Sequence, residues 1–294
     1  ILDLEGGDIC HYRYLLQLCS MVLAHEASDG GGGKRYGSFG HLSETVAWMF
    51  ATGETEAVKG LPLWKPRGSR TFRQGGYSFL RSRDGKVVIG IDHAPLGFGS
   101  IAAHGHADAL SFQLYVDGKC ILGDPGTFIY HCNLQKRNEY RLSCNHNYVT
   151  NGEEQSQMMG AFLWGKKAET TVTNLVLSPE KDELQGLCHW QNGFRHIRSF
   201  SFDKQRRLVV DDIFKASADG YAALVLHPAC KVSVSDGVAV IERDGIVARI
   251  EADVVPEIQA AWYSGEYGKE EKTKKLVYKL KNNKLTTTIW IEKC

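Results

Sequence analysis

The sequence lacks a large excess of charge of either sign. Its 35 Lys and Arg residues nearly balance its 34 Asp and Glu residues, which gives a formal net charge of +1. This balance argues against a strongly basic nucleic-acid-binding protein, so we expect no nucleic-acid partner. No apolar run approaches the roughly 18–20 residues of a membrane-spanning helix, because Gln17 and Ser20 interrupt the longest one. We therefore expect no membrane span.

Several motifs are also missing. None of the eight cysteines forms a CxxC pair, which excludes a zinc ribbon and a thioredoxin-type site, and we expect mostly buried free thiols. The absence of P-loop, GxGxxG and GxSxG motifs removes the nucleotide-binding and serine-hydrolase interpretations that rest on them. Proline is scarce, with 7 residues against 31 glycines, and this composition favours a turn-rich β protein over a helical bundle.

The residues that are present predict a mainly β protein with a short helical segment at the N-terminus. Hydrophobic residues make up 43% of the chain, which is enough for a sizeable core. Helical spacing of apolar residues predicts helices over residues 9–27 and 42–51. Alternating or continuously apolar runs, separated by turns, then predict an antiparallel β-sandwich or stacked sheets. The expected strands are 70–79, 86–91, 110–116, 120–122, 147–150, 168–177, 186–191, 196–203, 208–214, 221–227, 238–242, 246–251, 276–279 and 286–292. The charge-rich run 269–275 is predicted to be a solvated loop.

The first candidate site is the pair His104 and His106. In an extended segment, residues two apart lie on one face at a separation of roughly 6.6 Å, so two such imidazoles suit a metal ion. An isolated pair is a weak signal, and Asp124 and His146 are the further candidates. A two-residue Asp-Gly turn at 117–118 would place Asp124 opposite Ser111, at the same end of the hairpin as the histidines. It lies beside His106 only if the chain bends around 107–109; otherwise Asp124 only caps the turn 124–127.

The run from Leu96 to Lys167 resembles the C-terminal β region of the heparinase II/III-like polysaccharide lyases. The likeness extends more loosely over most of residues 64–294. The matching pieces occur in the same order and context, and they are Ala103-His104-Gly105-His106-Ala107-Asp108-Ala109-Leu110-Ser111-Phe112, Gly123-Asp124-Pro125-Gly126-Thr127, Arg137-Asn138, Arg141, His146-Asn147 and Gln155. Those lyases join a helical toroid to an antiparallel β part. The resemblance therefore implies that residues 1–63 are the end of a toroid and that 64–294 form the β domain.

The resemblance also implies a chemistry. The family cleaves acidic polysaccharides by β-elimination: a base removes the C5 proton of a uronic acid, and an acid protonates the leaving oxygen at C4. The uronate carboxylate must be neutralised, because the C5 proton is otherwise too weakly acidic. His104 matches the histidine at the family's active-site cleft. His106, Asp124 and His146 match its zinc ligands, and the implied Zn²⁺ is largely structural.

Other parts of the family's site lie in the toroid, where this sequence departs from the pattern. Tyr12 and Tyr14 lie where the family's catalytic tyrosine would be sought, but the Ser-Pro-x-Tyr-His-like run is absent, and packing of a helix face is the alternative. Arg137 and Arg141 could grip a substrate carboxylate or form structural ion pairs. The further candidates for substrate contact are Tyr130, His196 and Trp164, each of which could instead be a packing residue of the β region.

Three functions remain open from the sequence. The first is a lyase that acts on a glycosaminoglycan- or alginate-like polysaccharide, completed by an upstream helical domain of the same protein. The second is a non-catalytic carbohydrate-binding or structural β module, since the unusual start at Ile1 predicts a processed product or a fragment. The third is a zinc-dependent hydrolase. We expect a periplasmic or secreted location, with the cytoplasm as the alternative.

Overall fold

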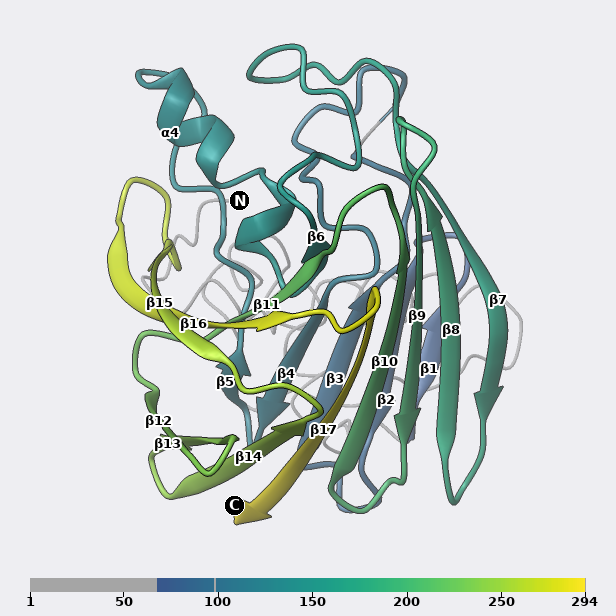
Figure 1. Ribbon diagram of the computed structural model, residues 1–294, viewed down its shortest axis with the longest axis vertical. Coiled ribbons are helices and arrows are strands. Elements are labelled where there is room, and N and C mark those ends of the chain that lie inside the picture. The colour runs from purple at the N-terminus through teal and green to yellow at the C-terminus, as the bar shows by residue number, and fades with distance from the viewer. Residues whose placement is uncertain (1–67, 98, 294) are drawn as a thin grey trace, which may run out of the picture. The chain divides into compact units, whose positions relative to one another are not determined.

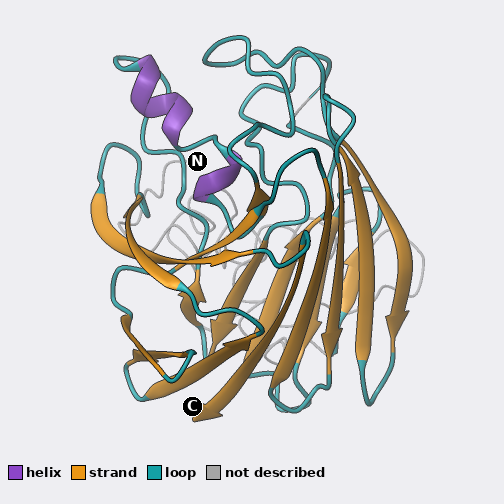
Figure 2. Cartoon of the chain, in the orientation of Figure 1, coloured by secondary structure: helices purple, strands orange, loops and turns teal. Residues whose placement is uncertain are grey.

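Antiparallel strands dominate the part of the chain that the computed structural model describes, residues 68–97 and 99–293 (Figures 1 and 2). The chain divides between Arg67 and Gly68, and all elements below belong to the second unit. The predicted helices 9–27 and 42–51, Tyr12 and Tyr14, and the proposed toroid remnant 1–63 lie outside the described residues. No helix in the described ranges is long and apolar enough to cross a membrane.

A five-stranded sheet begins the β unit. Its strands follow chain order, and each pairs antiparallel with the next. They are β1 (Arg70–Phe72), β2 (Tyr77–Arg81), β3 (Val87–Asp92), β4 (Phe112–Val116) and β5 (Lys119–Leu122). Every second residue of β3 and β4 is buried; alternation predicted β4, whereas a continuously apolar run predicted β3.

A second sheet has eight strands in the order β12-β13-β14-β17-β10-β9-β8-β7. In Figure 1 it stands in front of the five-stranded sheet. Its strands are β7 (Glu169–Leu177), β8 (Asp182–His189), β9 (Arg195–Phe202), β10 (Arg207–Lys215), β12 (Lys231–Ser235), β13 (Val238–Arg243), β14 (Ile246–Ala252) and β17 (Lys284–Lys293). Its buried face packs with the first sheet in one hydrophobic core, where the rings of Phe112 and Phe200 meet edge to face at 5.6 Å.

A four-stranded sheet of order β15-β16-β11-β6 completes the unit. Its strands are β6 (Val149–Thr150), β11 (Tyr221–Val225), β15 (Glu257–Tyr263) and β16 (Glu271–Lys279). The helix α4 (Leu134–Glu139) and the 3₁₀ turn η1 (Ser143–Asn145) lie in the connection between β5 and β6. Asn133 caps α4, because its side chain accepts a hydrogen bond from the backbone N–H of Lys136.

The mainly β prediction is confirmed, and so is the hairpin at 117–118. Asp117 and Gly118 both have positive φ, as a two-residue turn of this kind requires, and Val116 pairs with Lys119. The pairing then shifts by one residue between Leu114 and Tyr115, which the sequence pattern did not indicate. This bulge displaces every later residue of β5 by one position relative to β4, so the register that predicted Asp124 near Ser111 is shifted by one residue.

Some elements were missed. The strands β12 and β15 lie at sheet edges, where only one neighbour is present and little of the strand is buried, so their burial signal is weak. The charged run 269–275 was expected to be a loop, but β16 begins at Glu271. Pairing with β15 satisfies the backbone hydrogen bonds of this segment. The side chains of Lys272 and Lys274 remain exposed to solvent, so a strand can carry these charges.

A candidate metal centre beside an exposed histidine

A left-handed turn separates the two histidines of the His-Gly-His motif. His104 has a φ of 63°, and the N–H of Gly105 donates to the carbonyl oxygen of Ala102 at 3.0 Å. A side chain at Gly105 would lie 3.0 Å from that oxygen and 3.1 Å from the backbone of Gly97, so the turn is crowded. The expectation of one extended segment with both imidazoles on one face is therefore wrong. His104 is exposed, whereas His106 is partly buried.

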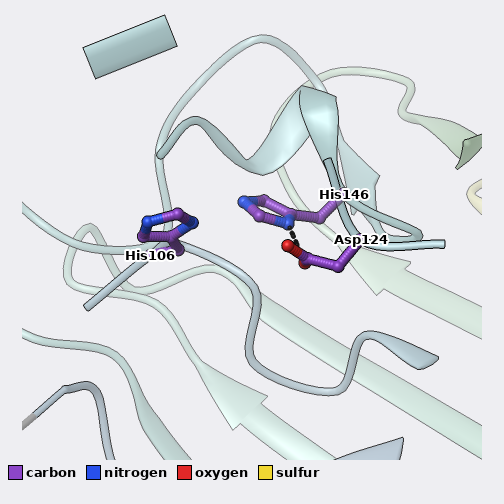
Figure 3. Close-up of side chains that lie close together, drawn as sticks. All are labelled: His106, Asp124 and His146. Atoms are coloured by element: carbon purple, nitrogen blue, oxygen red, sulfur yellow. Dashed lines mark hydrogen bonds and ion pairs between the residues drawn. The ribbon is translucent and has the colours of Figure 1, made fainter. Parts of the chain in front are cut away.

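His106 instead meets Asp124 and His146, as Figure 3 shows. One potential ligand atom from each residue lies within 4.8 Å of the other two. The Nδ1 atom of His146 is 2.8 Å from Oδ2 of Asp124, and the two imidazole rings are 5.4 Å apart between centroids. The meeting depends on a bend before β4, where Leu110 has a φ of 66°. The N–H of Ser111 donates to the carbonyl oxygen of Asp108 at 2.8 Å, so the chain turns over residues 108–111, which overlaps the 107–109 bend that the sequence-based prediction required.

The ligand atoms of these three side chains are of the types that bind zinc. Two imidazoles and one carboxylate are common zinc ligands. His146 is fully buried, and its Nε2 atom has no hydrogen-bond partner among the described residues, which is rare for a buried polar atom. A metal ion would give that atom a partner. Asp124 also accepts a hydrogen bond from the N–H of Gly126, which fixes the carboxylate at the start of its turn.

A competing contact lies at His106. Its Nε2 atom is 3.0 Å from Nη1 of Arg137 and 3.4 Å from the hydroxyl oxygen of Thr127. Since a guanidinium only donates, this nitrogen of His106 is unprotonated. In this structure its lone pair accepts a hydrogen bond from Arg137. A metal ion that bound to this nitrogen would have to displace the guanidinium.

All three groups have shifted pKa values without a metal. Burial, followed by repulsion from His146, lowers the pKa of His106 to about 3. Burial also opposes charge on His146, but attraction by Asp124 outweighs it and raises the pKa of His146 to about 9. For Asp124, burial favours the neutral form, yet His146 and the hydrogen bonds hold its pKa below the usual value. His106 is thus neutral at pH 7, and metal binding would release a proton from His146.

An aromatic rim surrounds His104. The edge of the His104 imidazole faces the rings of Tyr130 and Phe162, at centroid distances of 5.0 and 5.5 Å. Tyr130 in turn lies 5.6 Å from both Phe162 and Tyr267. Tyr267, in the loop between β15 and β16, is exposed, and no motif in the sequence pointed to it. Exposed aromatic rings beside an imidazole form a surface on which a sugar ring can stack.

Arg137 lies beneath this rim. It is fully buried on α4, with its guanidinium carbon 5.2 Å from the centre of the Tyr130 ring. No carboxylate pairs with it within the described ranges, and its Nε and Nη2 atoms have no partner there. Burial lowers its pKa from the usual value. Arg137 is thus a buried positive charge without a carboxylate partner of its own in the described part of the chain.

Three more of the predicted substrate contacts are buried, as Arg137 is. Arg141 is fully buried and donates to protein oxygens of Gly105, Asn138 and Gly160. Trp164 is only 2% exposed, and its indole N–H donates to the same carbonyl of Gly105, so its ring is not a surface for a sugar. His196 is fully buried against Asp212, at 2.7 Å. Alternate side chains of a strand point into the core, and His196 is one of the inward residues of β9. His196 is therefore a packing residue, which was the alternative to a substrate contact.

The chain is similar to known proteins in both sequence and fold. The sequence profile of the heparinase II/III-like, C-terminal family matches residues 65–292. A heparan sulfate lyase, HepC from Pedobacter heparinus, superposes with a TM-score of 0.68 at 19% identity, covering 82% of this chain and 38% of its own. A heparinase III structure gives a TM-score of 0.67 at 16% identity, covering 95% of this chain and 48% of its own. A search of curated proteins gives no match.

The structural matches, at under 25% identity, establish the fold. The chain spans less than half the length of the solved heparinase structures that it matches. The profile match covers more than half of the chain and includes all three candidate metal ligands and His104. The chain therefore belongs to the heparinase II/III-like family, a family of polysaccharide lyases, and carries its C-terminal domain.

Proposed function

We propose that this protein takes part in the cleavage of a uronic-acid-containing acidic polysaccharide, of the glycosaminoglycan or alginate type, by β-elimination. The observation that carries the proposal is the division of the His-Gly-His motif. The turn at His104 presents one imidazole to solvent among aromatic rings, while His106 lies beside a partly buried carboxylate and a second, buried imidazole. His104 is thereby accessible for proton transfer, and His106 is placed to hold a structural metal ion.

In this proposal, His104 transfers a proton in the elimination. Its exposure lets a substrate reach it, and its contacts with Tyr130 and Phe162 hold the ring in one orientation. The aromatic rim formed by Tyr130, Phe162 and Tyr267 would stack on the sugar rings next to the cleaved bond. Arg137 would raise the positive potential beneath the uronate, although its burial keeps it from direct contact in this conformation.

A second proton-transferring group, and the group that neutralises the uronate carboxylate, would come from the helical part of the site. Tyr12 and Tyr14 stay candidates for the former. The upstream helical domain, an acidic polysaccharide partner and a periplasmic or secreted location are likewise proposals.

His106, Asp124 and His146 would hold the Zn²⁺. When bound, this ion would supply a positive charge that cross-links the segment before β4, the end of β5 and the segment before β6. The three residues would thereby fix the backbone from which the turn at His104 begins. A site with three protein ligands leaves room for a water ligand, which keeps a zinc-dependent hydrolase as the alternative.

The test is an assay of acidic polysaccharides with zinc supplied, using the chain alone and joined to any helical domain encoded upstream of it. β-Elimination creates an unsaturated uronate, which absorbs ultraviolet light, whereas hydrolysis gives a saturated product. Appearance of the unsaturated product, and its loss in His104→Ala, supports the proposal. Cleavage to saturated ends would support the hydrolase, and glycan binding without any product would support the non-catalytic module.

A further inference from the structure

We infer that Arg198 and Asn147 are positioning residues that hold the segments bearing the three metal ligands in register; this inference rests on the proposed metal centre. Neither residue touches a ligand side chain in the described structure. Both lie in the core, and some of the hydrogen bonds that they make end on backbone carbonyls close to the ligands in the chain.

Arg198 projects from β9 into the core and is 1% exposed. Its Nε and Nη2 atoms donate to the two carboxylate oxygens of Asp212, on the neighbouring strand β10, at 2.7 and 3.1 Å. Its Nη1 atom donates to the carbonyl oxygens of Leu110, at 3.0 Å, and Asn147, at 2.6 Å. One guanidinium therefore ties the eight-stranded sheet to two segments that come from elsewhere in the chain.

These two carbonyls lie next to the candidate ligands. Leu110 is the left-handed residue of the bend that brings His106 toward Asp124, and its conformation is unfavourable for a branched side chain without support. Asn147 directly follows His146. Arg198 thus fixes the bend and the backbone of one ligand at the same time.

The side chain of Asn147 extends the same network to the third ligand. Its Nδ2 atom donates to the carbonyl oxygens of Phe112, at 2.6 Å, and Gly123, at 3.1 Å. Its Oδ1 atom accepts from the N–H of Val225 at 2.6 Å. Gly123 directly precedes Asp124, so Asn147 links the backbone on the N-terminal side of one ligand to the backbone on the C-terminal side of another.

Stability alone gives no strong reason for such a charge pair in a core. Replacing a buried ion pair by apolar residues of similar volume is often neutral or stabilising. Here the pair occupies an inward position of a sandwich whose other inward residues are mostly apolar, such as Phe200 and Val210. What an apolar replacement could not supply is the directed contact with two separate backbone carbonyls. That contact is what a site built from distant segments requires.

The test measures zinc affinity by chelator competition, and unfolding by denaturant in the absence of zinc, on the 294-residue chain. Arg198→Lys keeps the charge but loses the planar fork, and Asn147→Ala removes three hydrogen bonds. We expect each substitution to weaken zinc binding by about 10–100-fold, which is the range typical of residues that orient metal ligands without binding the metal. Asp182→Asn is the matched control. It breaks a buried ion pair with Lys204 in the same sheet, at 2.9 Å, without touching the network, so it should destabilise the chain at unchanged zinc affinity.

A second readout does not need the metal. In the zinc-free wild-type chain, the hydrogen bond between His146 and Asp124 should give a downfield Nδ1 proton signal in NMR, and this signal should be lost or shifted in both variants but not in the control. A folded Arg198→Lys protein with wild-type zinc affinity and an unchanged signal would overturn the inference. If the wild-type chain binds no zinc, the metal centre is refuted, and the NMR signal alone decides whether the network positions His146.

Discussion

The Nδ1 atom of His146 lies 2.8 Å from a carboxylate oxygen of Asp124, on an imidazole that has no exposed surface. The two residues are 22 positions apart in the chain and come from the end of β5 and the segment before β6. Without a metal they form an ion pair, and with a metal they would share one cation. Both the stability and the metal affinity of this unit should therefore depend on this contact.

The ion pair predicts a pH-dependent effect of Asp124→Asn in zinc-free protein. The pKa of His146 rises from 6.5 to about 9 in the folded state, so its contribution to stability is complete below pH 6.5 and is lost as the pH rises through 9. The pKa of Asp124 lies below 3.8, so its contribution is present above pH 3.8 and is lost in stronger acid. The substitution should cost on the order of 2–3 kcal/mol near pH 6, and much less above pH 9.

Denaturant unfolding at a series of pH values, with a chelator present, measures this difference. Asp211→Asn, at an exposed position on β10, is the control and should follow the wild type throughout. A penalty for Asp124→Asn that stays constant from pH 6 to pH 10 would contradict the ion pair.

Zinc binding should require all three candidate ligands. Replacing His106, Asp124 or His146 by Ala should each reduce the zinc affinity more than 100-fold, because each change removes a direct ligand. Zinc should raise the thermal unfolding temperature of the wild type but not of these variants, since a ligand stabilises only the state that binds it. The exposed His131→Ala is the control. Normal zinc affinity in any of the three ligand variants would remove that residue from the site.

His104→Ala should abolish turnover while leaving folding intact. The side chain is exposed, but the left-handed backbone at His104 is less favourable for alanine, so the loss of stability should be about 1 kcal/mol. Product formation would be followed by the absorbance of the unsaturated uronate, and folding by thermal unfolding. Zinc affinity should also be unchanged, because His104 is not one of the three candidate ligands. Retained turnover would exclude a catalytic role for His104, whereas a large loss of stability would show that the ring is a packing residue.

Trp164 and Phe162 should respond in opposite ways. Trp164→Phe removes the indole N–H that donates to Gly105 at 3.2 Å and reduces the ring that contacts Arg141 at 4.4 Å, so it should cost about 1–3 kcal/mol of stability. Phe162→Ala removes an exposed ring of the rim, so it should raise KM with little effect on unfolding. The comparison of unfolding and steady-state kinetics checks both. A raised KM with unchanged stability in Trp164→Phe would restore Trp164 as a substrate contact.

Much of the fold follows from local patterns in the sequence. Alternation of apolar and polar residues in 110–116 predicted β4, because one face of a strand in a sandwich is buried and the other is not. The Asp117-Gly118 turn predicted the β4–β5 hairpin, since both residues tolerate positive φ. The edge strand β15 was missed because little of it is buried on either face, so no alternation of buried and exposed residues marks it.

The sequence by itself determined the class of fold, the resemblance to the lyase family, and the identity of the three metal-ligand candidates. Only the tertiary structure decided that His104 and His106 diverge, because a crowded left-handed turn overrides the two-residue periodicity of an extended strand. It also decided that Trp164 and His196 are buried and that Tyr267 joins the rim. Burial depends on which distant strands pack against a residue, and no local pattern contains that information.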